Sequence, residues 1–161
     1  MCGERPEWLG ELVGKLSSLG AKVEESRIVL KVEVGPESLR KAAELLLQYG
    51  YDHLASVEGI DWPSRGVVEV VYFAESYEPE KRSMLIELKT AVPRDNPKLQ
   101  SLIEVWPNAL FMERETWEML GVTFEGNPDL RRLLLPPDWS GPPPLRKDYK
   151  VAEEGVYVEY E

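Results

Sequence analysis

The chain has 161 residues, with 19 Lys or Arg against 29 Asp or Glu, so its formal net charge is −10. This acidic balance argues against nonspecific binding to nucleic acid or anionic lipid, because phosphate groups are recognised by clustered Lys and Arg. The length predicts one domain with an appendage and a real hydrophobic core. Because no stretch approaches the roughly 20 apolar residues of a membrane span and no secretory signal opens the chain, we expect a soluble intracellular protein that reaches a membrane only through partner subunits.

The first fifty residues predict two helices and two strands. Residues 7–19 have the apolar spacing of an amphipathic helix. Residues 28–34 alternate as a half-buried strand does, and residues 21–25 predict a short edge strand beside it. A second helix opens at residues 35–38 and ends at Gly50. The apolar face predicted for the half-buried strand consists of Ile28, Leu30, Val32 and Val34.

Three further strands are predicted at about residues 51–59, 67–75 and 82–92, and the middle one is apolar enough to be central. The element order α-β-β-α-β-β-β predicts an α+β fold, a two-layer sandwich with helices on one face of a five-stranded mixed sheet. Residues 93–106 predict a short helix that begins near Pro97 and buries Trp106.

The carboxyl third begins with a predicted helix that Asn108 caps and Gly121 ends. The prolines that follow cannot lie inside helices or central strands, which predicts an extended arm. We therefore divide the chain into a sheet domain, residues 1–106, and a signature helix with an extended partner-binding arm, residues 107–161. Because a free loop has no reason to carry large apolar residues, we expect a partner to cover those of the arm: Phe124, Leu130, Leu133, Leu134, Leu135, Trp139, Leu145 and Tyr149.

Residues suited to chemistry are scarce. Cys2 and His53 are the only residues of their types, and neither a dinucleotide-binding nor a P-loop glycine motif occurs. Glu113, Glu115 and Glu118 suggest a carboxylate metal site, but Glu113 and Glu115 point ~200° apart on a helix. The favoured alternative is a charged helix face on which Arg114 pairs with Glu118. We predict no catalytic, cofactor-binding or metal-binding residue in this chain.

Five short blocks resemble the 30-kDa subunit, also called the C subunit, of respiratory complex I, a family shared with membrane-bound hydrogenases. They are Glu113-Arg114-Glu115, Glu118-Met119-Leu120-Gly121, Phe124-Glu125-Gly126, Pro128-Asp129-Leu130-Arg131-Arg132 and Leu145-Arg146-Lys147-Asp148-Tyr149. A more diffuse resemblance extends back to about Tyr51. The chain departs from many family members at Asn127, where they have His, and in the longer segment 140–145.

The resemblance implies a cofactor-free structural and assembly subunit in the peripheral arm of an NADH-, ferredoxin- or F420-dependent quinone oxidoreductase. Such a subunit lies on the cytoplasmic face of the cell membrane. Its partners are the large catalytic subunit (49-kDa, hydrogenase-large-like) and iron-sulfur subunits, which hold the clusters. One alternative is the equivalent subunit of a membrane-bound nickel-iron hydrogenase or a related ferredoxin-linked complex. Asn127, in place of the His of many complex I members, favours this alternative. A second is a small stand-alone enzyme that uses Glu113, Glu115, Arg131 and Arg132.

We expect the contact with a partner to use the charged and aromatic residues of the signature region. Arg suits forked contacts with carboxylates of a partner. The predicted partner-binding residues are Glu113, Arg114, Glu115, Trp117, Phe124, Asp129, Arg131, Arg132, Trp139, Arg146, Lys147, Asp148 and Tyr149.

Overall fold

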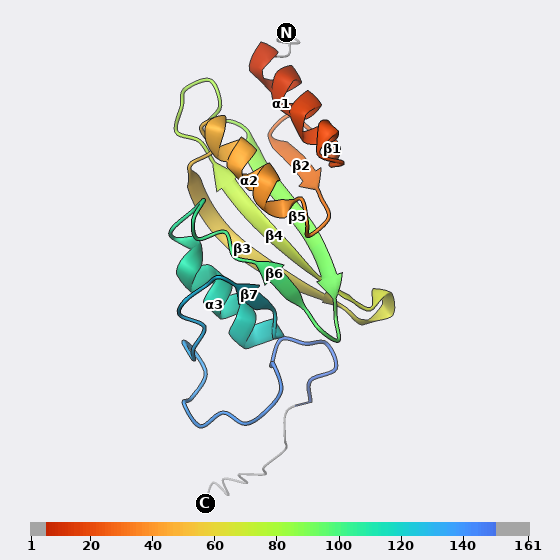
Figure 1. Cartoon of the computed structure of the whole chain (residues 1–161), viewed down its shortest axis with the longest axis vertical. Helices are drawn as coiled ribbons and strands as arrows, with labels where there is room; N and C mark the ends of the chain where they lie inside the picture. The colour runs from red at the N-terminus through yellow and green to blue at the C-terminus, as the bar shows by residue number, and fades with distance from the viewer. Residues whose placement is uncertain (1–5, 151–161) are drawn as a thin grey trace, which may run out of the picture.

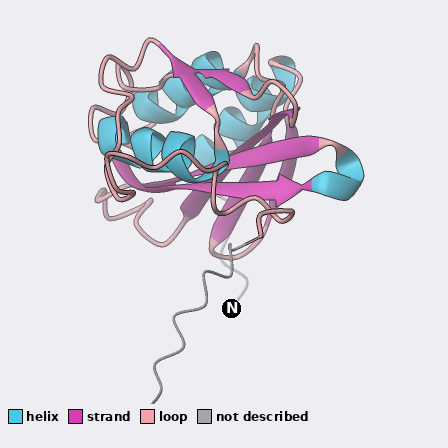
Figure 2. Cartoon of the chain, turned by 90° about the horizontal axis from the view of Figure 1, so that it is seen from below, coloured by secondary structure: helices cyan, strands magenta, loops and turns pink. Residues whose placement is uncertain are grey.

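The structure is a computed structural model that describes residues 6–150 (Figure 1). Its α-helices lie on one face of the large sheet (Figures 1 and 2). The elements are, in chain order, α1 (Glu7–Ser18), β1 (Lys22–Glu25), β2 (Val29–Glu33), α2 (Leu39–Gln48), β3 (His53–Trp62), the 3-10 helix η1 (Pro63–Arg65), β4 (Val67–Glu75), β5 (Leu85–Pro93), β6 (Lys98–Gln100), α3 (Ala109–Leu120) and β7 (Thr123–Glu125).

The large sheet has the strand order β1-β2-β5-β4-β3. β2 and β5 are parallel, whereas the other neighbours are antiparallel. The predicted α+β fold with a five-stranded mixed sheet is therefore confirmed. The predicted edge strand pairs with the half-buried strand as β1 with β2, and β4 lies between two strands with most of its residues buried.

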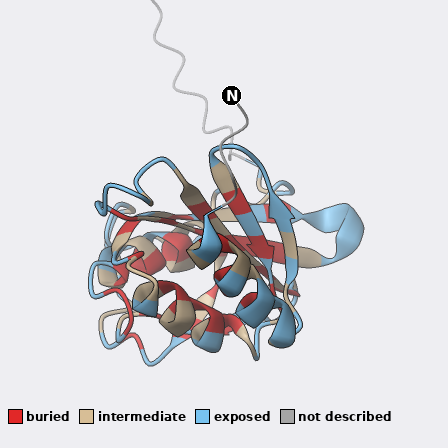
Figure 3. Ribbon diagram, turned by 90° about the horizontal axis from the view of Figure 1, so that it is seen from above, coloured by how far each residue is buried: buried red, intermediate tan, exposed pale blue. Residues whose placement is uncertain are grey.

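Helices α1 and α2 form because leucines and alanines recur at helical spacing on one side of each. Figure 3 shows these buried sides turned inward. Each helix is followed by a glycine with a left-handed backbone, Gly20 at φ 81° and Gly50 at φ 84°, which a residue with a Cβ adopts only at a cost. The buried helix residues are Leu9, Leu12, Leu16, Leu39, Ala42, Ala43 and Leu46.

Helix α3 packs on β3 at Gly59. A Cβ at Gly59 would lie 2.2 Å from Cδ1 of Leu120 and 3.1 Å from Cγ2 of Thr116, so the absence of a side chain permits this close approach. One hydrophobic core contains α1, α2 and the sheet together with Trp106, Leu120 and Phe124. Residues on both sides of the 106/107 boundary thus share a core.

The structure differs from the sequence-based expectation between residues 93 and 108. Residues 98–100 form β6, which pairs in parallel with β7, so the predicted helix at Pro97 is wrong. The three-residue spacing of Leu99 and Leu102 imitates a helix, but the backbone partners of this segment come later in the chain, after α3. Asn108 occupies the N-cap position of α3, yet its side chain makes no cap and instead donates a hydrogen bond to the carbonyl of Leu54.

The bounds of three strands also differ. β3 begins at His53 and runs to Trp62 instead of ending near Gly59. β2 begins at Val29, and Ile28 is 61% exposed instead of joining the apolar face. β5 begins at Leu85, since residues 78–84 form a turn in which the N–H groups of Lys81 and Arg82 bond to the carbonyl of Glu78. Within residues 6–150, no helix combines the length and the apolar character that crossing a membrane requires.

Candidate docking surface

Glu113 is a buried link between α3 and two other segments. Its side chain is fully buried and accepts hydrogen bonds from Oγ of Ser101 at 2.6 Å, from the N–H of Leu102 at 2.8 Å and from Nδ2 of Asn127 at 3.0 Å. Burial raises the pKa of Glu113, and these three donors only partly oppose that rise. The carboxyl group therefore serves internal hydrogen bonding and is closed to solvent.

Arg114 ties α3 to the beginning of residues 126–150, which are named the arm from here on. Its guanidinium pairs with Asp129 at 3.0 Å, donates to the carbonyl of Arg131 at 2.6 Å, and also donates to the carbonyl of Arg132. The predicted pair between Arg114 and Glu118 is wrong, because both side chains turn away from each other's charge toward backbone groups of the arm. The planar guanidinium group carries several N–H donors in a fixed fork, so it can bind one carboxylate and two carbonyls at once.

Glu118 holds the middle of the arm. Its carboxylate accepts hydrogen bonds from three successive backbone N–H groups, those of Leu133 at 3.1 and 3.2 Å, Leu134 at 2.8 Å and Leu135 at 3.0 Å. Burial by itself would raise the pKa of Glu118, but the N–H groups and the charge of Arg132 together hold it below its ordinary value. The predicted charged helix face is thus a buried attachment site.

The end of the arm is fastened to the sheet. The N–H of Lys147 donates to Oδ2 of Asp61 at 2.8 Å, and Arg94 bridges Asp61, at 2.7 and 3.1 Å, and Asp148, at 2.6 Å. Nε of Arg146 also donates to the carbonyl of Leu120 at 2.8 Å. Arg94 lowers the pKa of Asp61 and, by the same pairing, that of Asp148. The arm therefore lies against its own chain.

These contacts sort the predicted partner-binding residues into three groups. Glu113 and Arg114 are committed to internal contacts, and Phe124 is in the core with 1% of its surface exposed. The expectation that a partner covers Phe124 is therefore wrong. Half-buried residues are Trp117, Asp129, Arg132, Trp139, Arg146 and Tyr149. Exposed residues are Glu115, Arg131, Lys147 and Asp148.

The exposed part of this region defines a candidate docking surface. Large apolar side chains stand open on it: Phe111 on α3, and Leu133, Leu134 and Leu145 on the arm. Several open apolar side chains in one region mark an interaction site more often than scattered single residues do. We define the docking surface as Phe111, Glu115, Arg131, Leu133, Leu134, Leu145, Lys147 and Asp148.

The side chains suggested for a small stand-alone enzyme do not come together in one site. Glu113 is buried, Glu115 is exposed on another face of α3, and Arg131 pairs with Asp129 at 2.5 Å. No group of three or more metal-ligating side chains occurs among residues 6–150. His53 lies on β3 with its ring 5.3 Å from that of Tyr77, and Cys2 lies outside the described residues.

Sequence reasoning missed three residues outside the signature that hold α3 and the arm in place. Ser101 bonds to Glu113 of α3, and Asp61 and Arg94 fasten the end of the arm, through contacts that span 12 to 86 positions of sequence separation. The sequence did contain a sign of the role of Asp61. Asp61 is an acidic residue on a strand, and the positions next to it are hydrophobic.

The two buried carboxyl groups of α3 are expected to titrate on opposite sides of the ordinary Glu value of 4.5. Glu118, with a depressed pKa, stabilises the fold above 4.5, and this contribution is lost as the pH falls through its folded pKa. Glu113, with a raised pKa, contributes below 4.5, and its contribution is lost as the pH rises through its folded pKa. NMR amide shifts report each: the N–H of Leu134 should titrate below 4.5 and the N–H of Leu102 above it. Midpoints on the same side would contradict this assignment.

The comparisons with known proteins agree on one family. The family model described as "Respiratory-chain NADH dehydrogenase, 30 Kd subunit" matches residues 32–155. The C subunit of the F(420)H(2) dehydrogenase of Methanosarcina mazei is 39% identical over 127 residues, 78% of this chain and 78% of that protein. This chain belongs to the 30-kDa subunit family. The resemblance noted in the five sequence blocks is confirmed.

Another relative matches along nearly the whole chain, and two solved structures have a similar fold. The C subunit of the NADH-quinone oxidoreductase of Roseiflexus castenholzii is 38% identical over 160 residues, 97% of this chain and 90% of that protein. Among solved structures, a trypsin-resistant fragment of Nqo5 is 26% identical with a TM-score of 0.64, covering 76% of this chain and 99% of the fragment. A chain of the archaeal membrane-bound sulfane sulfur reductase shares the fold, with a TM-score of 0.78 and 24% identity over 91% of this chain and 88% of that one.

Proposed function

We propose that this chain is a cofactor-free structural and assembly subunit of a complex I type quinone oxidoreductase. In this proposal it lies in the peripheral arm on the cytoplasmic face of the membrane and docks on the large catalytic subunit, near the iron-sulfur subunits that carry the clusters. The observation that carries the proposal is the family match over residues 32–155. The names of the relatives, which are C subunits of F(420)H(2) dehydrogenase and of NADH-quinone oxidoreductase, support it.

The anchored arm supports a docking role in physical terms. An arm already fixed by Arg114, Glu118 and Asp61 loses little further chain entropy when a partner binds it. The favourable contact energy is then not offset by the cost of ordering the arm.

Asn127 bears on the type of complex. Its Nδ2 donates to the carbonyl of Leu110 at 3.2 Å and to Glu113 at 3.0 Å, while its Oδ1 accepts from the N–H of Asp129 at 3.0 Å. These internal bonds give Asn127 a structural task in this chain. The departure from His therefore does not by itself favour the hydrogenase type, and we retain the quinone oxidoreductase type.

The first experiment is purification of the tagged full-length chain from its own cells, with mass spectrometry of what accompanies it. The expected set contains a large catalytic subunit and iron-sulfur subunits of a quinone oxidoreductase. A set that includes nickel-processing proteins would instead support the hydrogenase type. Recovery of the chain alone, as an active enzyme, would overturn the proposal.

A charge reversal at Arg131 is expected to weaken assembly without unfolding the chain. The side chain of Arg131 is 74% exposed and pairs with Asp129. Arg132 is a poorer choice because it donates to the carbonyl of Trp139 and lies over the ring of Trp117. Arg131→Glu should lower recovery of partner subunits severalfold while the melting temperature stays unchanged.

The matched control is Arg82→Glu, an exposed arginine in the turn before β5. It makes the same charge change far along the chain from the arm. Equal recovery of partners with both variants would refute the assignment of Arg131 to the docking contact.

A further inference from the structure

We propose that Leu133 and Leu134 form a preformed apolar anchor that enters an apolar pocket edged by carboxylates on the partner subunit. Glu118 is the positioning residue of this anchor. The inference rests on the proposed function and names the chemistry of the partner surface.

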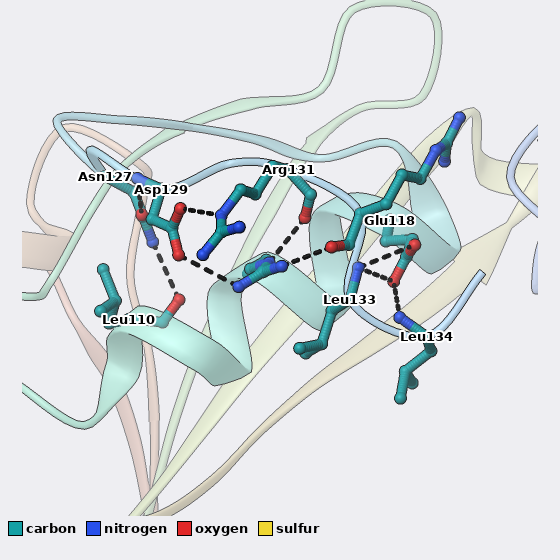
Figure 4. A network of polar contacts seen from close by, with 9 residues as sticks. Leu110, Glu118, Asn127, Asp129, Arg131, Leu133 and Leu134 are labelled. Atoms are coloured by element: carbon teal, nitrogen blue, oxygen red, sulfur yellow. Dashed lines mark hydrogen bonds and ion pairs between the residues drawn. The ribbon is translucent and has the colours of Figure 1, made fainter. Parts of the chain in front are cut away.

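One carboxylate, that of Glu118, fixes the backbone geometry of the anchor. The N–H groups of Leu133, Leu134 and Leu135 converge on Glu118, which is itself buried with 2% exposed. Figure 4 shows the side chains of Leu133 and Leu134 extending away from the carboxylate that holds their N–H groups. Three successive N–H groups on one anion form a concave backbone arrangement that suits negative charge. The side chains are therefore directed outward by the attachment itself.

Exposure of the two leucines is unusual for adjacent residues. Leu133 is 40% exposed and Leu134 is 60% exposed, and they are the only consecutive pair among the large exposed hydrophobic residues of the described chain. Pro136 and Pro137 follow after Leu135 and fix the backbone torsion beyond the anchor. A stiff, open apolar pair has the form of an interface anchor, because little conformational entropy is lost when a pocket receives it.

The charges beside the anchor specify the rim of the pocket. Arg131 stands exposed just before it, and the guanidinium of Arg132 lies 5.8 Å from the ring centre of Trp117. Residues 131–135 contain two arginines and no acidic residue. An apolar pocket with carboxylates on the side that meets these arginines complements both features. A pocket with a basic rim would place like charges together.

The test uses full-length variants expressed beside the wild-type chain in the native cells. The ratio of variant to wild type is measured by mass spectrometry in the purified complex and in the total extract. We expect Leu134→Ala to lower its incorporation about tenfold, as truncation of an anchor residue does, and Leu134→Asp to lower it further. Ile28→Asp is the matched control, since Ile28 is 61% exposed and precedes β2, on another part of the fold. It should incorporate like the wild type.

Glu118 is tested through its dependence on the leucines. If Glu118 acts by positioning them, Glu118→Gln lowers incorporation, and the double variant Glu118→Gln with Leu134→Ala loses little beyond Leu134→Ala alone. Additive losses, or a loss that follows only the melting temperature, would show a merely structural role for Glu118 and overturn that part of the inference.

The outcomes separate the anchor from the proposed function. If the wild-type chain assembles and both Leu134 variants assemble equally well, the anchor is wrong while the subunit assignment stands. If the wild-type chain brings down no oxidoreductase subunit, the proposed function itself fails.

Discussion

Trp106→Ala is expected to lower the free energy of unfolding by about 3–5 kcal/mol, the usual cost of truncating a fully packed aromatic residue. Trp106 is 1% exposed, and its ring lies 6.4 Å from that of Tyr72 on β4. Its Nε1 donates to the carbonyl of Tyr51 at 2.9 Å, which fastens the segment before α3 to the start of β3. Loss of the side chain leaves a cavity beside Tyr72 in the core and an unsatisfied carbonyl at Tyr51. Urea unfolding followed by circular dichroism measures the change.

Two variants test whether this effect is specific to the buried site. Trp106→Phe keeps most of the volume and should lose less, although it still removes the hydrogen bond. Phe111→Ala removes a comparable aromatic ring that is 56% exposed on α3, and should change stability by about 0.5 kcal/mol or less. Comparable losses for Trp106→Ala and Phe111→Ala would show that Trp106 has no special role in fastening the segment before α3 to the sheet.

Glu118→Ala is expected to free the middle of the arm while the core stays folded. The substitution leaves three N–H groups without their acceptor, and a local loss of about 2 kcal/mol, which is roughly 30-fold in the opening equilibrium, follows. Proteolysis of an opened segment follows that equilibrium when opening is fast. Trypsin should therefore cut after Arg131 or Arg132 about 30 times faster, as read by mass spectrometry over time.

Glu115→Ala is the control for the released arm. Glu115 is on the same helix three positions earlier and is exposed. Its removal should leave the trypsin rate near that of the wild type, and the melting temperature of both variants should reflect the intact core. If Glu118→Ala left the cleavage rate unchanged, some other contact would have to hold the arm.

The connection between fold and proposed function runs through α3. One side of this helix packs on β3, where Gly59 admits Leu120 and Thr116. Its buried charges, Arg114 and Glu118, hold the arm. A helix fixed to the sheet on one side and to the arm on another transmits the rigidity of the core to the docking surface. Destabilising the core at Trp106 and releasing the arm at Glu118 should therefore both impair assembly, by different routes.

The sequence alone determined the layout of the sheet domain, because its signals are local. Apolar residues at three- and four-residue spacing placed α1 and α2, and alternation placed β2, since these periods follow from backbone geometry. A nearly continuous apolar run placed β4, because a central strand is covered on both faces. Gly50 and Gly121 marked helix ends, because glycine readily adopts the left-handed backbone that follows a helix. The five signature blocks were enough to indicate the family before any tertiary contact was known.

Tertiary structure alone decided what the signature charges do. The sequence predicted a charged helix face for Glu113, Arg114 and Glu118. In the fold their partners are backbone groups and side chains 11 to 18 positions away, at Leu102, Arg132 and Leu134 among others. β6 was hidden for the same reason, as its partner strand comes after α3. Helical spacing tells which side of a helix a residue occupies, but only the folded chain shows whether water, the sheet or a returning segment lies there.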